Sequence, residues 1–215
     1  MNKSILNTVV AVVASVLFVV CVADNNPNDG GKIVNSGGDG NPSVSTFTDS
    51  RDGKVYKIVK VGSQFWFAEN LNYAEKGSKC YENKDDNCAK YGRMYDWAMA
   101  LKVCPAGFHL PSDDEWATLE NSVGGSITAS TKLKSAEGWN KNGGGTDDYE
   151  FSALPGGYGA SDGAFRDAGY DGLWWSATES IADNAWSRYM RSGNVWVDRY
   201  ANPKTSLFSV RCVAD

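Results

Sequence analysis

The feature that most restricts the fold is residues 103–116, VCPAGFHLPSDDEW, near the middle of the chain. Residues 105–107 are typical of a turn, and Pro111 biases the short segment before it toward extended backbone. Ser112 and Glu115 then form an S-x-x-E capping box, which marks the start of a helix. An apolar stripe with the spacing of a half-buried helix follows at Trp116, Leu119 and Val123, before Gly124-Gly125.

The composition narrows the class of protein. With 23 glycines and 8 tryptophans in 215 residues, the chain favours a loop-rich fold containing strands over a helical bundle. The formal net charge is -5, and no block of lysine and arginine is present, so we expect no nucleic-acid partner. His109 is the only histidine, which excludes a multi-histidine metal site and argues against a Ser-His-Asp triad.

Residues 1–23 have the pattern of a signal peptide. Lys3 supplies the positive charge, and the apolar segment 5–20 is short for a membrane span. Cys21 at its end resembles the lipidation site of a bacterial lipoprotein; the alternative is cleavage after Ala23, which would remove Cys21. Both alternatives predict an exported protein that enters an oxidising compartment.

The rest of the chain reads as a linker and one domain. Residues 24–46 contain few apolar side chains, so we expect a disordered linker, followed by a domain over residues 47–215. The pattern predicts an α+β fold with a β-hairpin, two helices and terminal antiparallel strands. The hairpin is expected at 54–61 and 65–68, one helix at about 91–102 and another from 113, and the strands at 173–179, 185–190, 195–200 and 207–213.

Two polar loops lack the signatures that would make them ligand sites. Residues 142–148 are rich in glycine, but no Gly-Lys-Ser/Thr is present, so they are not a phosphate loop. Residues 85–87 are acidic, but they lack the central glycine and distal glutamate of an EF-hand loop. The four cysteines after the signal, which are Cys80, Cys88, Cys104 and Cys212, allow three pairings.

Several phrases carry a resemblance to a known family. These are DGKVYKIVKVGSQFWFAENL (52–71), CPAGFHLPSDDEW (104–116), GTDDYEFSALPGG (145–157), WWSATE (174–179) and SVRCV (209–213). Over residues 47–215 the chain resembles the Fibrobacter succinogenes major paralogous domain family. More distantly, it is similar to the formylglycine-generating enzyme branch of the C-type lectin-like superfamily. Glu150 stands where the family usually has glycine.

The resemblance implies a C-type lectin-like fold with two helices, antiparallel strands and long loops. In such domains the N- and C-terminal strands meet, and a long-range disulfide ties the helical half to the last strand. The resemblance therefore favours Cys104–Cys212 over the other pairings, which leaves Cys80–Cys88 to close a small polar loop.

Enzymatic roles have weak support in the sequence. The distant resemblance implies a copper-dependent oxidase with a reactive cysteine pair, but Cys212 is the only late cysteine. A glycosidase would need two carboxylates roughly 5–10 Å apart. The sequence offers candidates without fixing any separation: Asp147, Asp148, Asp162, Asp167, Asp171 and Glu179. We therefore expect no enzyme and no cofactor.

Calcium-dependent sugar binding also lacks its usual residues. The Glu-Pro-Asn or Gln-Pro-Asp motif and the Trp-Asn-Asp motif of sugar-binding C-type lectins are missing, and Trp196-Val197-Asp198 matches the latter only in part. We therefore predict no metal site. A structural calcium near Asp183 and Asn184 has no further support in the sequence.

Non-catalytic binding is the favoured class. C-type lectin-like folds present ligands on long loops and adjacent strands, where this chain has aromatic residues beside hydrogen-bonding groups. The candidate ligand-binding residues are Tyr158, Tyr170, Trp186, Arg188, Trp196, Asp198, Arg199 and Tyr200. The same composition suits a polysaccharide or a protein partner, whereas Trp174 and Trp175 are expected to be largely core.

The resulting interpretation is a protein of the cell envelope. We expect an outer-membrane lipoprotein or cell-surface protein that touches the membrane only through a lipid anchor and binds a polysaccharide or surface protein. The alternative is a structural or assembly subunit of an envelope complex. A binding face should be open to solvent, whereas an assembly subunit should cover its patch with another chain.

Overall fold

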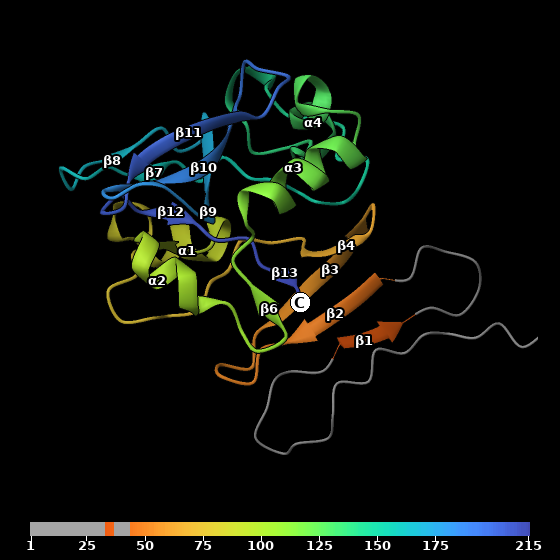
Figure 1. Ribbon diagram of the computed structural model, residues 1–215, viewed down its shortest axis with the longest axis horizontal. Helices are drawn as coiled ribbons and strands as arrows, with labels where there is room; N and C mark the ends of the chain where they lie inside the picture. Colours follow the sequence, from red (N-terminus) through yellow and green to blue (C-terminus); the bar gives the residue numbers. More distant parts are fainter. Residues whose placement is uncertain (1–32, 37–43) are drawn as a thin grey trace, which may run out of the picture.

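The computed structural model describes residues 33–36 and 44–215, which form a mixed α+β structure (Figure 1). Its strands are β1 (Ile33–Ser36), β2 (Val44–Thr48), β3 (Val55–Val61), β4 (Gln64–Phe67), β5 (Met94–Tyr95), β6 (Phe108–His109), β7 (Tyr158–Gly159), β8 (Phe165–Arg166), β9 (Asp171–Ile181), β10 (Asn184–Arg191), β11 (Asp198–Pro203), β12 (Phe208–Ser209) and β13 (Val213–Ala214). Its helices are α1 (Asp85–Tyr91), α2 (Trp97–Val103), α3 (Asp113–Ser122) and α4 (Ser126–Leu133), with single 3-10 turns η1 (Tyr81–Asn83) and η2 (Asn140–Asn142).

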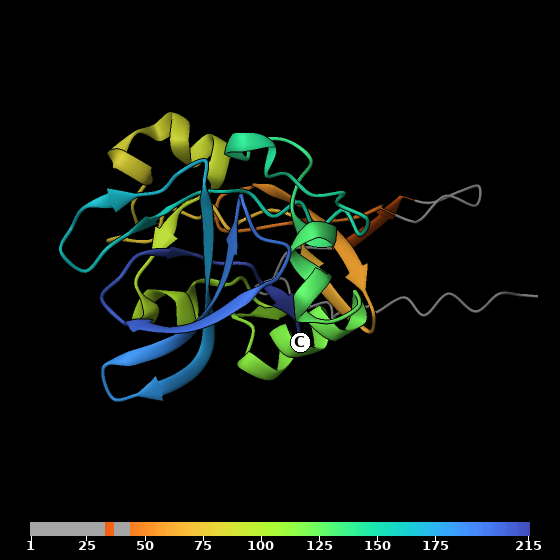
Figure 2. The ribbon, with the colours of Figure 1, turned by 90° about the horizontal axis from the view of Figure 1, so that it is seen from above.

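The strands of the described residues form three sheets. The first has the order β1-β2-β3-β4-β13-β6, the second has the order β11-β10-β9-β12-β5, and the third consists of β7 and β8. Figures 1 and 2 show strands β1–β4 at one end of the molecule and β9–β11 at the other. The last strand, β13, lies between β4 and β6, with Val213 opposite Trp66. The end of the chain is thus paired with the predicted N-terminal hairpin, which the structure confirms as β3–β4.

Strand β9 separates two hydrophobic cores. Trp174 and Trp175 are both fully buried, as expected, and point to opposite faces of the strand. Trp175 packs in the cluster that contains Met99, Ala100 and Val103 of α2. Trp174 packs in the cluster that contains residues of α3 and α4. One face of the second sheet is therefore covered by α2 and the other by α3 and α4.

The central stretch folds as its residues predict. The Phe108 N–H donates to the Pro105 carbonyl at 3.0 Å, which closes the turn before β6. At the start of α3, the Glu115 N–H donates to Ser112 Oγ at 3.2 Å and the Ser112 N–H donates to Glu115 Oε2 at 2.7 Å. This reciprocal pair is the predicted capping box.

Both favoured disulfides are present. Cys80 and Cys88 are joined across a Cα–Cα distance of 4.9 Å, and Cys104 and Cys212 across 5.9 Å. The first closes the polar loop, which also contains the unpredicted helix α1. The second joins the end of α2 to the segment before β13. Bridges of this kind persist in oxidising compartments, so they indicate an extracytoplasmic domain.

The predicted helix at 91–102 is wrong at its start. Residues 94–95 are strand β5, and α2 begins only after Asp96, whose carboxylate accepts from the Met99 N–H at 2.8 Å. Gly92 explains the break, because it has a φ of 77° and a Cβ there would lie 2.8 Å from Asn70 Cβ. Helix α4 was also missed, so the described residues form four α-helices where two were expected.

The strand predicted at 207–213 is divided because the chain changes sheets. Residues 208–209 pair in the second sheet, whereas residues 213–214 pair in the first. Between them, the Val210 and Cys212 carbonyls accept from the Leu71 and Phe67 N–H groups at 2.9 and 3.0 Å. The strand predicted at 195–200 begins later, at Asp198.

Two strands begin before residue 47. Strands β1 and β2 lie within or across the segment predicted as a linker, and β1 pairs with β2. The other residues of that segment, the predicted signal at 1–23 and Cys21 lie outside the described residues. Within the described residues, no helix is long and apolar enough to cross a membrane.

Candidate functional site

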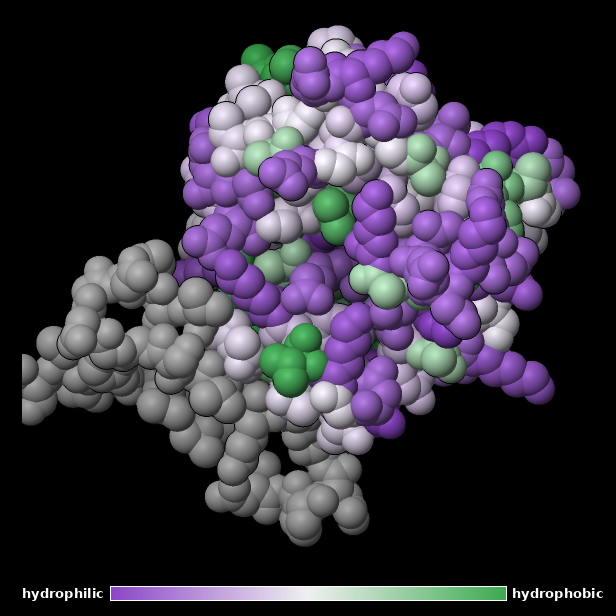
Figure 3. Space-filling view, turned by 180° about the vertical axis from the view of Figure 1, so that it is seen from behind, coloured by the Kyte–Doolittle hydropathy of each residue, from purple (hydrophilic) through white to green (hydrophobic). Residues whose placement is uncertain are grey.

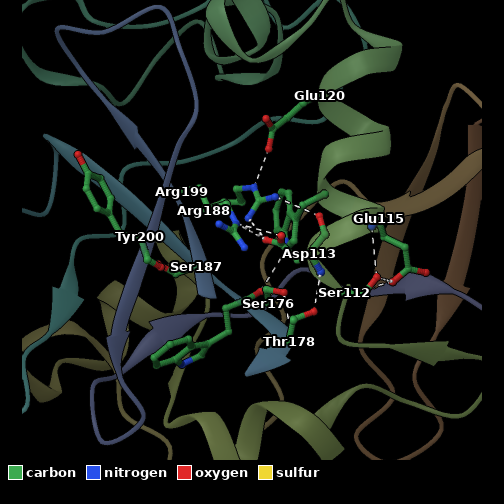
Figure 4. Close-up of polar contacts among 12 residues, drawn as sticks. Ser112, Asp113, Glu115, Glu120, Ser176, Thr178, Ser187, Arg188, Arg199 and Tyr200 are labelled. Carbon is green, nitrogen blue, oxygen red and sulfur yellow. Dashed lines mark hydrogen bonds and ion pairs between the residues drawn. The ribbon is translucent and has the colours of Figure 1, made fainter. Parts of the chain in front are cut away.

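The candidate residues on β10 and β11 are divided between two faces of the second sheet. Side chains alternate along a strand, and directly opposed residues share a face. Arg188 is opposite Arg199, whereas Ser187 is opposite Tyr200. Figure 4 shows Tyr200 and Ser187 lying apart from the cluster around Arg188. One face therefore carries Trp186, Arg188 and Arg199, and the other carries Asp198 and Tyr200.

On the first face, Arg188 is buried beneath α3 with an exposed fraction of 2%. Its Nε donates to Glu120 Oε1 at 2.6 Å and its Nη1 to Asp113 Oδ1 at 2.5 Å (Figure 4). Its Nη2 donates to the Asp113 carbonyl at 3.0 Å. Arg188 therefore joins both ends of α3 to β10, and its guanidinium is not at the surface.

Arg199 and Trp186 complete this cluster. Arg199 Nε donates to both carboxylate oxygens of Asp113 at 2.9 Å, and its guanidinium carbon lies 3.3 Å from the centroid of the Trp186 ring. Burial alone would raise the pKa of Asp113, but hydrogen bonds from Arg199 and Arg188 outweigh it and lower that pKa. Burial raises the pKa of Glu120 despite its bond to Arg188. We call these five residues the arginine cluster: Asp113, Glu120, Trp186, Arg188 and Arg199.

The second face contains a pocket of about 240 Å³, which we call the tyrosine pocket. Its lining residues are Tyr158, Leu173, Tyr189, Arg191, Tyr200, Ala201 and Asn202. Strand β7 supplies Tyr158, β9 supplies Leu173, and β10 and β11 supply the others. Tyr200 is 49% exposed and meets the Tyr189 ring edge to face, with centroids 6.0 Å apart. The pocket therefore combines aromatic rings with an amide and a guanidinium.

Hydrogen bonds hold the polar groups of the pocket in place. Asn202 Nδ2 donates to Ser187 Oγ at 2.8 Å, and Ser187 Oγ donates to the Tyr200 carbonyl at 3.2 Å. The Tyr189 hydroxyl is bonded to the buried carboxylate of Asp171. Burial, together with that bond, raises the pKa of Tyr189, so its hydroxyl stays protonated near neutral pH.

The other candidates lie at different places. Trp196 is 43% exposed in the loop between β10 and β11, beside the exposed Val195. That loop is attached to α4, because the Val197 N–H donates to the Ser126 carbonyl at 2.9 Å. Tyr170 is exposed just before β9. Of the eight candidates, only Tyr158 and Tyr200 line the tyrosine pocket, while the half-buried Asp198 shares its face of the sheet.

The comparisons with known proteins identify the family of this chain. A sequence model of the Fibrobacter succinogenes major domain matches residues 59–214. The chain belongs to this family. Neither a curated protein nor a solved structure matches the chain.

The Fibrobacter succinogenes major domain thus contains the arginine cluster, the tyrosine pocket and both disulfides, whereas β1 and β2 precede it. Sequence reasoning missed five pocket residues, which are Leu173, Tyr189, Arg191, Ala201 and Asn202. The available signal was the two-residue period of the strands, which places Tyr189 and Arg191 on the face of Ser187, and Asn202 on the face of Tyr200. Within the described residues, no group of three or more acidic, cysteine or histidine side chains could hold a metal ion.

Proposed function

We propose that this protein is an exported, lipid-anchored surface protein whose family domain binds polysaccharide without catalysis. The tyrosine pocket is the observation that carries this proposal. Ligand sites typically combine an apolar or aromatic lining with a few oriented polar groups. Tyr158, Tyr189 and Tyr200 supply the lining, and Arg191 and Asn202 supply the polar groups.

The pocket suits part of a polymer. An exposed tyrosine such as Tyr200 has an apolar ring face and a polar hydroxyl, which match the C–H face and hydroxyl edge of a sugar ring. The volume of about 240 Å³ is below the roughly 300–1,000 Å³ of pockets for complete small ligands. One sugar unit would enter the pocket while its neighbours stay outside.

The proposed role includes no reaction, cofactor or metal. Asp171 is the carboxylate bonded to the wall of the pocket, but it is buried and engaged by the Tyr189 hydroxyl. That contact holds it behind the aromatic lining instead of toward a bound sugar.

Export and anchoring rest on the N-terminal pattern together with the disulfides. Cys80–Cys88 and Cys104–Cys212 fit an oxidising compartment, and Cys21 is the proposed lipidation site in the outer membrane. Labelling of cells with a fatty-acid analogue should mark the wild-type protein and not the C21S variant. Equal labelling of both proteins would remove Cys21 from the proposal.

The binding test is a titration of the mature, oxidised protein against neutral and acidic plant and bacterial polysaccharides. We expect saturable binding that Tyr200→Ala abolishes and that Trp196→Ala leaves within about twofold, because Trp196 lies outside the pocket. A chelator should have no effect. If the protein bound none of the tested polysaccharides, the proposal would be overturned.

An assembly role is the second candidate, and exposed apolar side chains favour it. Val195 and Trp196 are 51% and 43% exposed, and Ile127 on α4 is 71% exposed. The face in Figure 3 is nevertheless mainly hydrophilic, with hydrophobic residues in small separate spots. Cross-linking on intact cells that depends on Trp196 but not on Tyr200 would support an envelope complex over polysaccharide binding.

A further inference from the structure

Arg191 stands at the wall of the tyrosine pocket in a fixed position. Its guanidinium carbon lies 4.4 Å from the centroid of the Tyr189 ring. Its backbone carbonyl accepts from Lys134 Nζ at 3.0 Å and from the Asn194 N–H at 3.2 Å. The backbone bonds therefore hold the main chain of Arg191 in place, and stacking on Tyr189 holds its side chain beside the aromatic lining. The residue nevertheless remains exposed.

The partners of Arg191 differ from those of the other exposed arginines in residues 45–215. Arg51 is paired with Asp49 at 2.6 Å, and Arg199 is paired with Asp113 at 2.9 Å. Arg191 forms no ion pair with a carboxylate in that part of the chain. A guanidinium carries five N–H donors in a planar fork that matches a carboxylate. The guanidinium of Arg191 forms a side-chain hydrogen bond with Tyr189, and its other donors are available to a ligand seated against that ring.

We propose that the sugar unit in the tyrosine pocket carries a carboxylate, so that the ligand is a uronate-containing polysaccharide. This inference rests on the proposed function. The sugar ring packs on the tyrosines, and its carboxylate accepts hydrogen bonds from Arg191. Bonds between a guanidinium and a carboxylate are stronger than neutral ones and fix the orientation of the ligand.

The charges around Arg191 favour a ligand whose carboxylate fits the guanidinium over any polymer that is merely negatively charged. Asp171 lies behind Tyr189, and the half-buried Asp198 is directly opposite Tyr189 on β11. These two carboxylates offset the single charge of Arg191. They would repel a densely sulfated chain. Such a chain would also gain less binding free energy from one guanidinium than a uronate, whose single planar carboxylate matches the fork.

A second cation lies next along the surface. The Ser192 N–H, adjacent to Arg191, donates to the Tyr170 carbonyl at 2.8 Å. Lys141 Nζ lies 5.7 Å from the centroid of the exposed Tyr170 ring. This tyrosine and lysine repeat the chemistry of the pocket and give a neighbouring sugar unit a second contact.

The test compares polygalacturonate, neutral dextran and dextran sulfate by calorimetric titration of the full mature protein. We expect the wild type to bind polygalacturonate more tightly than either other polymer. Arg191→Gln should weaken polygalacturonate binding about tenfold or more, with dextran binding unchanged. Arg191→Lys should recover only part of the loss, because an ammonium lacks the fork. Lys60→Gln, which removes one charge from β3 in the other sheet, is the matched control and should bind as the wild type does.

The outcomes separate this inference from the proposed function. Equal binding of polygalacturonate and dextran, or no effect of Arg191→Gln, would overturn the proposal that Arg191 recognises a carboxylate. The proposal of polysaccharide binding would remain intact. Tightest binding to dextran sulfate, weakened equally by Lys60→Gln, would show non-specific charge attraction and also overturn carboxylate recognition by Arg191. No binding of the wild type to any polymer would overturn both.

Discussion

Arg188, Arg199 and Arg191 lie on two neighbouring strands, yet their surroundings give them different roles. Arg188 is buried and bonded to two carboxylates under α3. Arg199 is exposed but shares Asp113 and stacks on Trp186. Arg191 is exposed, hydrogen-bonds Tyr189 and forms no ion pair with a carboxylate in residues 45–215. Residue type alone therefore does not separate a structural arginine from one available to a ligand.

Glu150 has a φ of 55°, in the left-handed region that favours glycine. Its side chain, which is 53% exposed, pairs with Lys57 at 2.5 Å. A left-handed backbone costs an L-residue about 1–2 kcal/mol, more than the roughly 0–1 kcal/mol of an exposed ion pair. We therefore predict that Glu150→Gly is more stable than Glu150→Ala by about 1 kcal/mol in urea unfolding. A less stable glycine variant would contradict this account.

His109 should make stability depend on pH. Its Nε2 lies 2.8 Å from Glu115 Oε1 and its Nδ1 lies 2.7 Å from Asp215 Oδ1. Burial would lower the pKa of His109, but bonds to Asp215 and Glu115 outweigh it and raise that pKa above 6.5. The stabilisation is thus fully present below about pH 6.5 and is lost as pH rises through the folded-state pKa.

The measurement is urea unfolding at several pH values from about 5.5 to about 8.5, which runs from roughly one unit below to roughly two units above the ordinary histidine pKa. We expect the wild type to lose a fraction of 1 kcal/mol across about this range, because the ring is 40% exposed and solvent screens the pairs. His109→Gln should lack that loss. A loss of equal size in the variant would assign the pH dependence to another group.

At the scale of elements, the arginine cluster determines how α3 sits on β10. Asp113 and Glu120 approach Arg188 from the first and last parts of the same helix. Removal of one partner from a buried pair costs about 3–5 kcal/mol, since it leaves an uncompensated charge. We predict that Arg188→Met destabilises the domain by about 3 kcal/mol.

A double-mutant cycle distinguishes this electrostatic cost from lost packing. Glu120→Gln added to Arg188→Met should cost less than the sum of the two single changes, because the orphaned carboxylate is gone. Urea unfolding of the four proteins gives the coupling. Strict additivity would show that Arg188 acts only by filling space.

At the scale of the whole molecule, the two disulfides close loops of very different length. Cys104 and Cys212 are separated by 108 positions and Cys80 and Cys88 by 8. The chain-entropy relation gives roughly 5 kcal/mol for the long loop and roughly 2.5 kcal/mol for the short one. Paired Cys→Ala variants should show this order in thermal unfolding. A larger loss for Cys80–Cys88 would indicate that the long loop stays compact in the unfolded state.

Sequence reasoning determined the features that depend on neighbouring residues. The capping box at Ser112 and Glu115 and the β3–β4 hairpin are local, so their residue types are sufficient to predict them. The disulfide pairing followed from the family resemblance, since cysteine spacing alone left three choices. The helix boundary at Asp96 was missed because Met94 before it shares one helical spacing with Trp97, Ala98 and Leu101 after it.

Only the tertiary structure decided which side chains form a site. Arg188 and Tyr189 are adjacent in the chain but lie on opposite faces of β10, and whether each face meets solvent depends on α2 and α3, which come from distant sequence. The register of β10 with β11 placed Tyr200 against Tyr189 and Arg199 on the other face. Local sequence determines that side chains alternate, whereas burial of each face is a property of the packed molecule, because it requires the other elements to be in place.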